Sequence, residues 1–272
     1  KSMYQILLPQ IKPMAGFNDF HNESFCFYEE INHYLDCSTC DYRATSWLID
    51  PSETEDNALL IAGELLSLLM GYMQVRNEKS IYNHLRINGI RLLNPNFFNV
   101  SRNFNEVQIP NFLLEEIWTN NESKKPNNPR ETNNLKRISF DALLYLSKSE
   151  IDVYILLKLM AEQASWYNLY QIYESLESFT TENNYPYLIE VQNGKKMIKV
   201  LDSADEKEKF TKPANNFSIV GLSARHGYQT IKKPIKISNC FNLEQSINFV
   251  YNHVRKYLQW KLEEFHKSDL FN

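Results

Sequence analysis

Residues 166–176 read WYNLYQIYESL, and this stretch decides the fold of the second half of the chain. Large apolar side chains recur in it at intervals of three and four residues, at Trp166, Leu169, Tyr170, Tyr173 and Leu176. Such spacing places side chains on one face of an α-helix. We therefore expect a helix whose apolar face packs against other helices, with Tyr173 in or at the edge of the core.

Three further segments of the second half have helical patterns. Residues 140–146 and 151–160 are strongly apolar, and residues 242–265 again space apolar side chains by three or four positions. Asn242 stands three residues before Gln245, which is the spacing of a capping box at a helix N-terminus. These segments predict a mainly α-helical bundle that closes with a long amphipathic helix.

A β-hairpin is predicted within this helical half, at residues 186–201. Two short runs rich in apolar residues, 187–191 and 195–200, flank the pair Asn193-Gly194. An Asn-Gly pair supplies the positive φ values that a type I′ turn requires. We expect the hairpin to be attached to the outside of the bundle.

The first part of the chain mixes strand and helix signals. Residues 24–28 and 44–49 are short, aromatic and β-branched, and residues 81–93 contain the hairpin signal Asn88-Gly89. These segments predict antiparallel strands. Together with the apolar helix described next, they favour an α+β unit.

The longest apolar run is predicted to be a buried helix over residues 59–73. Ser52 and Glu55 have the spacing of a capping box that opens it. The run contains Glu64, is interrupted by Gly71, and is shorter than the roughly 20 residues that a membrane span needs. No secretory signal precedes it. We therefore expect no membrane contact and a cytoplasmic protein.

A polar segment separates the two halves. Residues 120–134 contain no apolar side chain, so they cannot bury surface that would offset the entropy lost on ordering. We interpret them as a linker. The predicted fold class is α+β, with an N-terminal mixed strand and helix domain over residues 1–119 and a mainly α-helical domain over residues 135–272.

Charge and motif content limit the function classes. The 272 residues include 29 Lys and Arg and 33 Asp and Glu, which gives a formal net charge of −4. This balance provides no overall cationic field for non-specific capture of nucleic acid, although a local basic groove is compatible with it. The sequence has no glycine-rich phosphate-binding motif, no nucleophile elbow and no H-E-x-x-H. We expect no cofactor.

The cysteines leave two interpretations open. Cys37 and Cys40 have the C-x-x-C spacing of a zinc half-site or a redox pair. The remaining zinc ligands would be His33 and either Cys26 or His21, which is an irregular set, and the sequence has no second C-x-x-C. We favour reduced structural thiols and predict no metal site.

Arg225 and His226 are the candidate catalytic residues. They place a permanent cation beside a group that titrates near neutrality, and this pair is needed to hold a phosphate and move a proton. Gly227 follows them and permits a close approach of the backbone. The candidate binding residues around the pair are polar or basic. They are Asn215, Asn216, Lys232 and Lys233.

The order of several segments resembles a known family. Trp166–Glu174 reads W-x-x-L-Y-x-x-Y-E, Phe210–Asn215 reads F-T-x-x-A-N, and Ala224–Gly227 reads A-R-H-G. A Lys/Pro loop and a final amphipathic helix follow. This arrangement is similar to HEPN domains, helical bundles found in bacterial toxin and anti-phage systems, including ApeA-type defence proteins. The resemblance extends over about residues 140–265.

The resemblance implies a bacterial defence protein, a homodimer and an RNA substrate. In active HEPN ribonucleases an Arg and a His, separated by four to six residues, converge on the scissile phosphate, usually across a dimer interface and without metal. By this likeness Arg225 would polarise the phosphate and His226 would transfer protons. The two are adjacent here, which departs from the family spacing. The departure favours the alternative, a non-catalytic scaffold or module that binds a protein partner and dimerises through its helical domain.

Each candidate residue also has a structural interpretation. Arg225 would cap helix carbonyls or pair with Glu174, and His226 would be an ordinary loop residue. Asn215 and Asn216 would be turn formers.

The remaining basic residues have ordinary interpretations as well. Lys232 and Lys233 would belong to a solvated loop rather than contact RNA. His253 and His266 lie within the last predicted helix, and we interpret both as surface residues.

Overall fold

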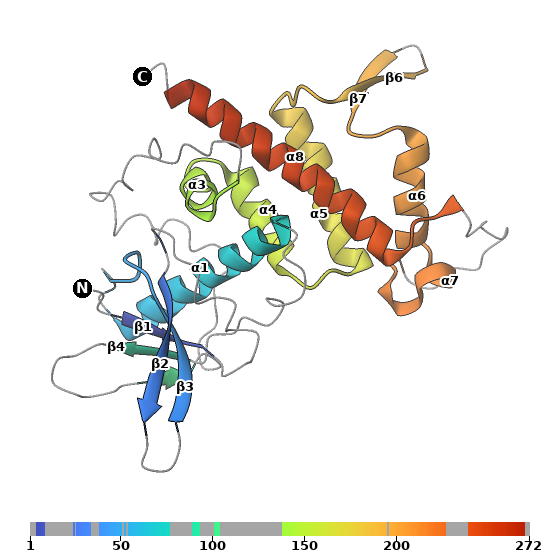
Figure 1. Ribbon diagram of the computed structural model, residues 1–272. Coiled ribbons are helices and arrows are strands. Elements are labelled where there is room, and N and C mark those ends of the chain that lie inside the picture. Colours follow the sequence, from blue (N-terminus) through green and yellow to red (C-terminus); the bar gives the residue numbers. More distant parts are fainter. Residues whose placement is uncertain are drawn as a thin grey trace. The chain divides into compact units, whose positions relative to one another are not determined.

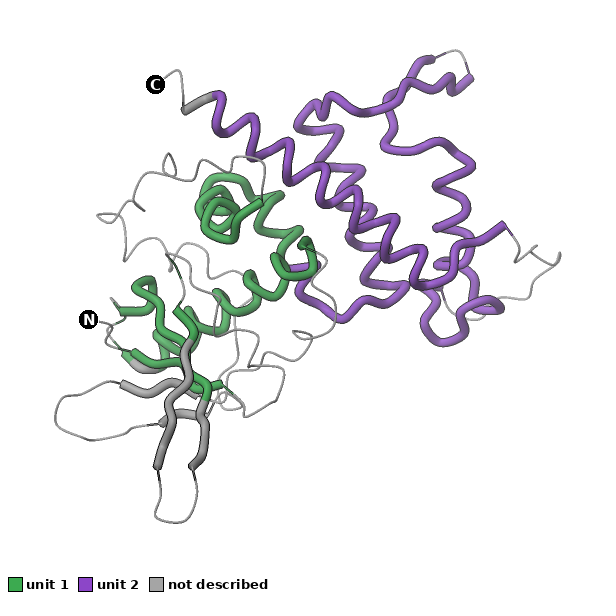
Figure 2. The backbone as a smooth tube through the Cα atoms, viewed as in Figure 1, with its two compact units in different colours: residues 1–157 green, residues 158–272 purple. Residues whose placement is uncertain are grey.

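The computed structural model describes residues 4–8, 24, 26–33, 38–50, 52, 54–76, 89–92, 101–103, 138–194, 196–226 and 239–269. The chain divides into two compact units, residues 1–157 and 158–272 (Figure 2). The first unit combines a sheet with helices, and the second is helical with one hairpin (Figure 1). The predicted α+β class is confirmed.

Unit 1 contains a five-stranded antiparallel sheet in the order β2-β3-β1-β4-β5. The strands are β1 (Tyr4–Leu7), β2 (Cys26–His33), β3 (Ser38–Thr45), β4 (Gly89–Leu92) and β5 (Ser101–Asn103). In the central strand, Ile6 is paired with Ala44 on one side and with Ile90 on the other. Ile6 and Ala44 are fully buried, which fixes this register because a shift by one residue would expose them.

The strand prediction for residues 44–49 is wrong at its C-terminal end. β3 ends at Thr45, and residues 47–50 form a turn. Ser46 determines this turn: its hydroxyl accepts a hydrogen bond from the Leu48 N–H at 3.3 Å, and its carbonyl accepts one from the Ile49 N–H at 3.2 Å. The hairpin predicted at residues 81–93 is wrong at its turn. Gly89 begins β4, which pairs with β1 on one side and with β5 on the other, and residues 81–88 lie outside the described residues.

The longest apolar run lies in helix α1 (Glu55–Val75). The helix is capped by Thr54 and not by Ser52, because Thr54 has the extended backbone of an N-cap and accepts a hydrogen bond from the Asn57 N–H at 3.2 Å. By length and composition Asp56–Val75 could cross a membrane, yet 78% of the tested window is buried inside the molecule. The helix therefore resembles a core helix of a water-soluble protein.

Two helices that the sequence assigned to the second domain pack against α1 instead. They are α3 (Phe140–Leu146) and α4 (Ile151–Ala161), and both match predicted helical segments. The Tyr154 hydroxyl donates a hydrogen bond to the buried carboxylate of Glu64 in α1. The boundary between the two units falls inside α4. The predicted linker at residues 120–134 lies outside the described residues.

Unit 2 is built from α5 (Trp166–Glu182), α6 (Ala204–Ala214), α7 (Phe217–Val220), the short 3₁₀ helix η4 (Gly221–Ser223) and α8 (Leu243–Asp269). Its core centres on Phe210 of α6, which is fully buried. The Phe210 ring lies 5.3 Å from the Tyr173 ring of α5 and 5.8 Å from the Phe249 ring of α8. The apolar face predicted for α5 is buried except at Tyr170, which is half-buried.

The capping box predicted at the start of the last helix is confirmed. The Gln245 N–H donates to Asn242 Oδ1 at 2.8 Å, and the Asn242 N–H donates to Gln245 Oε1 at 2.9 Å. This reciprocal pair satisfies two backbone N–H groups, those of Asn242 and Gln245, that the helix end would otherwise leave unpaired. α8 is therefore fixed at its N-terminus.

The predicted hairpin consists of β6 (Ile189–Asn193) and β7 (Lys196–Val200). Its turn differs from the prediction. Asn193 pairs with Lys196 as the last rung of the ladder, and the positive φ of 62° belongs to Gly194. The loop therefore starts at Gly194, because glycine adopts a positive φ without steric cost. Asn193 stays in the strand and does not adopt a positive φ.

Candidate functional site

Arg225 lies in a turn that folds back onto α6. The turn begins after α7 and η4, and the Arg225 N–H donates a hydrogen bond to the Ala214 carbonyl at the end of α6, at 2.8 Å. Gly221 has a φ of 61°, which allows the chain to reverse between α7 and η4. Arg225 is therefore positioned by its backbone as well as by its side chain.

The Arg225 side chain is engaged by α5. Its Nη2 lies 3.2 Å from Glu174 Oε1, and its Cζ lies 4.1 Å from the centre of the Tyr170 ring. The ion pair and the cation–π contact each contribute on the order of 0.5–1 kcal/mol at a partly exposed position. The Glu174 pair is the structural alternative given for Arg225 above. Only 33% of the Arg225 side chain is exposed, so the guanidinium is largely used within the protein.

His226 differs from its neighbour. It is exposed, and it makes no hydrogen bond or ion pair with any residue that the structure describes. The adjacent candidates Lys232 and Lys233 lie outside the described residues. The described part of the site therefore contains one exposed imidazole beside a cation that is already paired.

Asn215 and Asn216 lie at two helix ends. Asn215 is the C-cap of α6, and its N–H donates to the Thr211 carbonyl at 3.0 Å. Asn216 is the N-cap of α7, and its Oδ1 accepts a hydrogen bond from the Ser218 N–H at 3.0 Å. Both therefore have the turn-forming role that was their structural interpretation, while Oδ1 of Asn215 is buried without a hydrogen-bond partner in the described chain.

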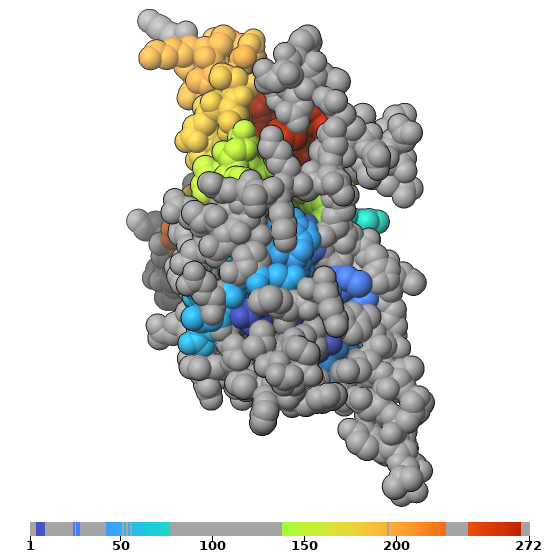
Figure 3. Space-filling model, turned by 90° about the vertical axis from the view of Figure 1, so that its left-hand side faces the viewer, coloured from blue at the N-terminus to red at the C-terminus, as the bar shows by residue number. Residues whose placement is uncertain are grey.

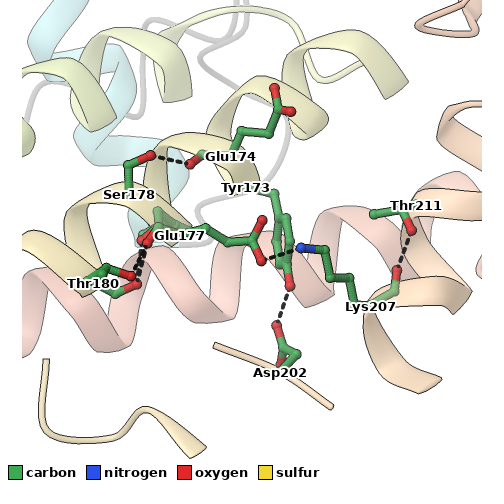
Figure 4. Close-up of polar contacts among 10 residues, drawn as sticks. Tyr173, Glu174, Glu177, Ser178, Thr180, Asp202, Lys207 and Thr211 are labelled. Carbon is green, nitrogen blue, oxygen red and sulfur yellow. Dashed lines mark hydrogen bonds and ion pairs between the residues drawn. The ribbon is translucent and has the colours of Figure 1, made fainter. Parts of the chain in front are cut away.

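Unit 2 also contains a buried polar cluster that was not among the sequence predictions. Asp202, between β7 and α6, is buried. Its Oδ2 accepts a hydrogen bond from the Tyr173 hydroxyl at 2.9 Å, and its Oδ1 lies 3.1 Å from His253 Nε2 of α8 (Figure 4 shows the first contact). Two helices, α5 and α8, thus converge on one carboxylate. The interpretation of His253 as a surface residue is wrong, because 84% of its side chain is covered.

Burial sets the protonation of Tyr173. It raises the pKa of the phenol well above its usual value, and the negative charge of Asp202 raises it further. The hydroxyl is therefore a permanent donor to Asp202 at neutral pH. Lys207 pairs with Glu177, and the Lys207 Nζ lies 5.7 Å from the centre of the Tyr173 ring (Figure 4).

The exposed side of α5 forms an open depression of about 640 Å³. Its lining is acidic and hydroxylic, and consists of Glu174, Glu177, Ser178, Thr181 and Glu182. Two of the carboxylates are paired with Arg225 and Lys207. With three carboxylates and two partner cations, the lining of this depression, as far as the structure describes it, offers no surplus positive charge to a phosphate.

Comparison with known proteins adds nothing to this geometry. The chain has no significant match among protein-family models, curated proteins or solved structures.

One signal in the sequence pointed to the buried cluster. His253 stands next to Val250 and Tyr257 on the helical wheel of α8, and both are buried. A histidine inside an apolar face needs a polar partner, since an unpaired buried polar group is costly. The sequence does not identify that partner, because Asp202 follows a strand and has no periodic context.

Proposed function

We propose that this protein is a non-catalytic, HEPN-like binding module of a bacterial defence system that engages a protein partner in the cytoplasm. One observation carries the proposal: the Arg225 guanidinium is paired with Glu174 and stacked on Tyr170. The residue that a ribonuclease of this kind would direct at phosphate instead holds the last turn onto α5.

A phosphate that approached Arg225 would meet the negative charge of Glu174. Metal-independent RNA cleavage needs a cation on the phosphate and a nearby group that transfers protons. Arg225 would have to exchange the Glu174 carboxylate for the phosphate, and Glu174 would then face the phosphate across an acidic depression. Repulsion between these like charges opposes that exchange.

A second function, RNA binding or cleavage, is favoured by a different observation. His226 is exposed and adjacent to Arg225, and Lys232 and Lys233 follow within a few residues. In that case the Glu174 pair would act as a masking contact that RNA displaces. The two functions therefore differ in what Glu174 does.

The experiment compares four proteins on labelled total RNA and tRNA at low salt. They are the wild type and the variants Arg225→Ala, His226→Ala and Glu174→Gln. For a non-catalytic module we expect no cleavage by any of them, and no RNA binding that Arg225→Ala or His226→Ala weakens. Thermal unfolding should separate the variants instead: Arg225→Ala lowers the melting temperature, and His226→Ala leaves it unchanged.

Two results would contradict the proposal. One is RNA cleavage by the wild type that His226→Ala abolishes. The other is tighter RNA binding by Glu174→Gln than by the wild type, because that variant releases the Arg225 guanidinium without removing it. Either result would establish the second function.

A further inference from the structure

The hairpin β6–β7 is the least covered part of unit 2. Tyr187 at its base is 66% exposed and Met197 is 63% exposed, and Ile189 and Ile198 are exposed as well. Figure 3 shows the hairpin, in light orange, at the surface of the molecule. A two-stranded hairpin is marginally stable in water without a further strand or a covering surface. Its exposed apolar side chains therefore indicate an interaction surface.

The strand register separates the hairpin into two faces. Ile189 lies opposite Val200, and Val191 lies opposite Ile198, so that one face is apolar except for the Asn193–Lys196 pair beside the turn. The other face carries two mixed pairs, Glu190 with Lys199 and Gln192 with Met197. This alternation is typical of a sheet with one covered and one solvated face.

The two edges of the hairpin differ in charge. β7 contacts α5 and contains Lys196 and Lys199. Lysine on an edge strand discourages pairing with another strand. β6 contains neither lysine nor proline, and among the described strands it pairs with β7 alone. β6 is therefore the edge that is left open for pairing.

We propose that β6 pairs antiparallel with β6 of a second copy of this chain, about a two-fold axis at Val191. The proposal names the partner of the binding role proposed above and rests on it. In this register Glu190 lies opposite Gln192 of the second copy, and Ile189 lies opposite Asn193 of the second copy. No like charges meet, and the Gln192 amide can donate to the Glu190 carboxylate twice in the dimer.

The paired hairpins form a four-stranded sheet in the order β7-β6-β6-β7. The lysine-bearing strands become its two outer edges, where lysine opposes further growth. The two-fold axis also keeps Val191 of both copies on the same face, so that the two apolar faces join into one. The open edge of β6 thus forms a closed dimer, and the lysines of β7 oppose the addition of further copies into a fibre.

The test places opposite charges at position 192 of the full chain. Gln192→Glu sets two pairs of like charges across the two-fold axis, and Gln192→Lys sets two pairs of opposite charges. Met197→Glu is the matched control, because Met197 lies beside Gln192 on the same face but on the outer strand. Sedimentation equilibrium over a range of concentrations gives the dissociation constant of each dimer.

We expect the wild type to dimerise, Gln192→Glu to raise the dissociation constant about fivefold, and Gln192→Lys to lower it about fivefold. Met197→Glu should change it by less than about twofold. Wild-type and Gln192→Lys proteins that both stay monomeric would overturn the pairing, and so would a dimer that is indifferent to the charge at position 192.

The RNA assay on the same preparations keeps the two proposals apart. A dimer indifferent to position 192 that does not cleave RNA overturns the strand pairing and leaves the proposed function standing. Cleavage of RNA by the wild type overturns the proposed function whatever the association state.

Discussion

At the scale of single residues, Asp202 connects more of unit 2 than any candidate taken from the sequence. Its carboxylate receives the Tyr173 hydroxyl from α5 and faces His253 Nε2 from α8. It also directly precedes Ser203, whose side chain accepts a hydrogen bond from the Glu206 N–H and caps α6. One buried residue therefore links the middle of α5, the middle of α8 and the start of α6.

Removing one partner of Asp202 should destabilise the protein without creating a large cavity. Tyr173→Phe keeps the ring in the core and deletes the hydroxyl, which leaves a buried carboxylate oxygen short of a donor. We expect the free energy of unfolding to fall by about 1–3 kcal/mol. Urea denaturation followed by circular dichroism measures this change.

The control for this prediction is Tyr167→Phe. Tyr167 belongs to the same helix but is exposed, and its hydroxyl only accepts a weak hydrogen bond from Gln171 at 3.3 Å. Its removal should change stability by less than about 0.5 kcal/mol. Equal losses for the two variants would mean that the Tyr173 contact is not a stabilising one. Adding His253→Ala to the wild type and to Tyr173→Phe completes a double-mutant cycle. The cycle measures the coupling between Tyr173 and His253 through Asp202.

Single residues also show where sequence reasoning stops. The partner of Arg225 was within reach, because Glu174 lies on the exposed side of a helix whose apolar face was already assigned. The partner of His253 was not, because hydrophobic periodicity identifies the buried face of a helix but not the residues that pack against that face. Asp202 sits in a connection between a strand and a helix, where side chains follow no repeat.

At the scale of elements, the contact between α1 and α4 depends on Gly71. A Cβ atom at this position would overlap the Leu157 carbonyl oxygen and crowd its carbonyl carbon. Both obstacles are backbone atoms and cannot rotate away. The glycine is thus required for the close approach of two helices.

Gly71→Ala should therefore lower the free energy of unfolding, although alanine is the better helix former. The steric cost of overpacking is about 1–3 kcal/mol beyond the gain in helix propensity. The measurement is urea denaturation of the full chain. Ser67→Ala, one turn earlier in α1, should leave stability within about 0.5 kcal/mol of the wild type. A Gly71→Ala protein as stable as the wild type would show that α4 can move away from α1.

Helix ends were predicted where the chemistry is local. The Asn242 and Gln245 pair forms the expected reciprocal hydrogen bonds. The equally good pattern at Ser52 and Glu55 does not, because Thr54 competes for the same helix end and the chain turns at residues 47–50 first. A capping motif therefore predicts that a helix begins nearby, and the neighbouring turn decides at which residue.

At the scale of the whole molecule, buried tyrosines limit stability at high pH. Burial raises the pKa of Tyr251 in α8 to about 12, against about 10 in the unfolded chain. The unfolded state therefore loses its proton first. Stability from this group is fully present below about pH 10 and is lost between about pH 10 and pH 12, by at most about 1.4 kcal/mol per pH unit.

Tyr251→Phe should remove this part of the alkaline loss. The free energy of unfolding, measured by urea denaturation between about pH 9 and pH 11.5, should fall less steeply in the variant than in the wild type. Tyr167→Phe is again the matched control, because it removes an exposed phenol from the same unit. Parallel curves for the wild type and Tyr251→Phe would show that Tyr251 ionises alike in both states.

The class of the fold was predictable, and its division was not. Alternating and helical patterns identified strands in the first part, and helices with one hairpin in the second. The boundary was placed at the polar segment of residues 120–134, whereas the two units meet inside α4. The sequence of an apolar helix such as residues 151–160 does not indicate which of two cores the helix packs into. Here the hydrogen bond from Tyr154 to Glu64 places the first part of α4 in the core of unit 1.

Both connections of the hairpin to the helices are fixed, and this has a consequence for anything bound to it. On the side of α5, the Tyr185 ring packs against Tyr257 and Trp260 of α8 at 5.6 and 5.2 Å. On the side of α6, β7 leads within two residues into Asp202. A molecule that binds the hairpin β6–β7 is consequently held at a fixed angle to α5 and α8. Two joined C-terminal units would be a particle of defined shape, suited to presenting a pair of identical surfaces at a constant spacing.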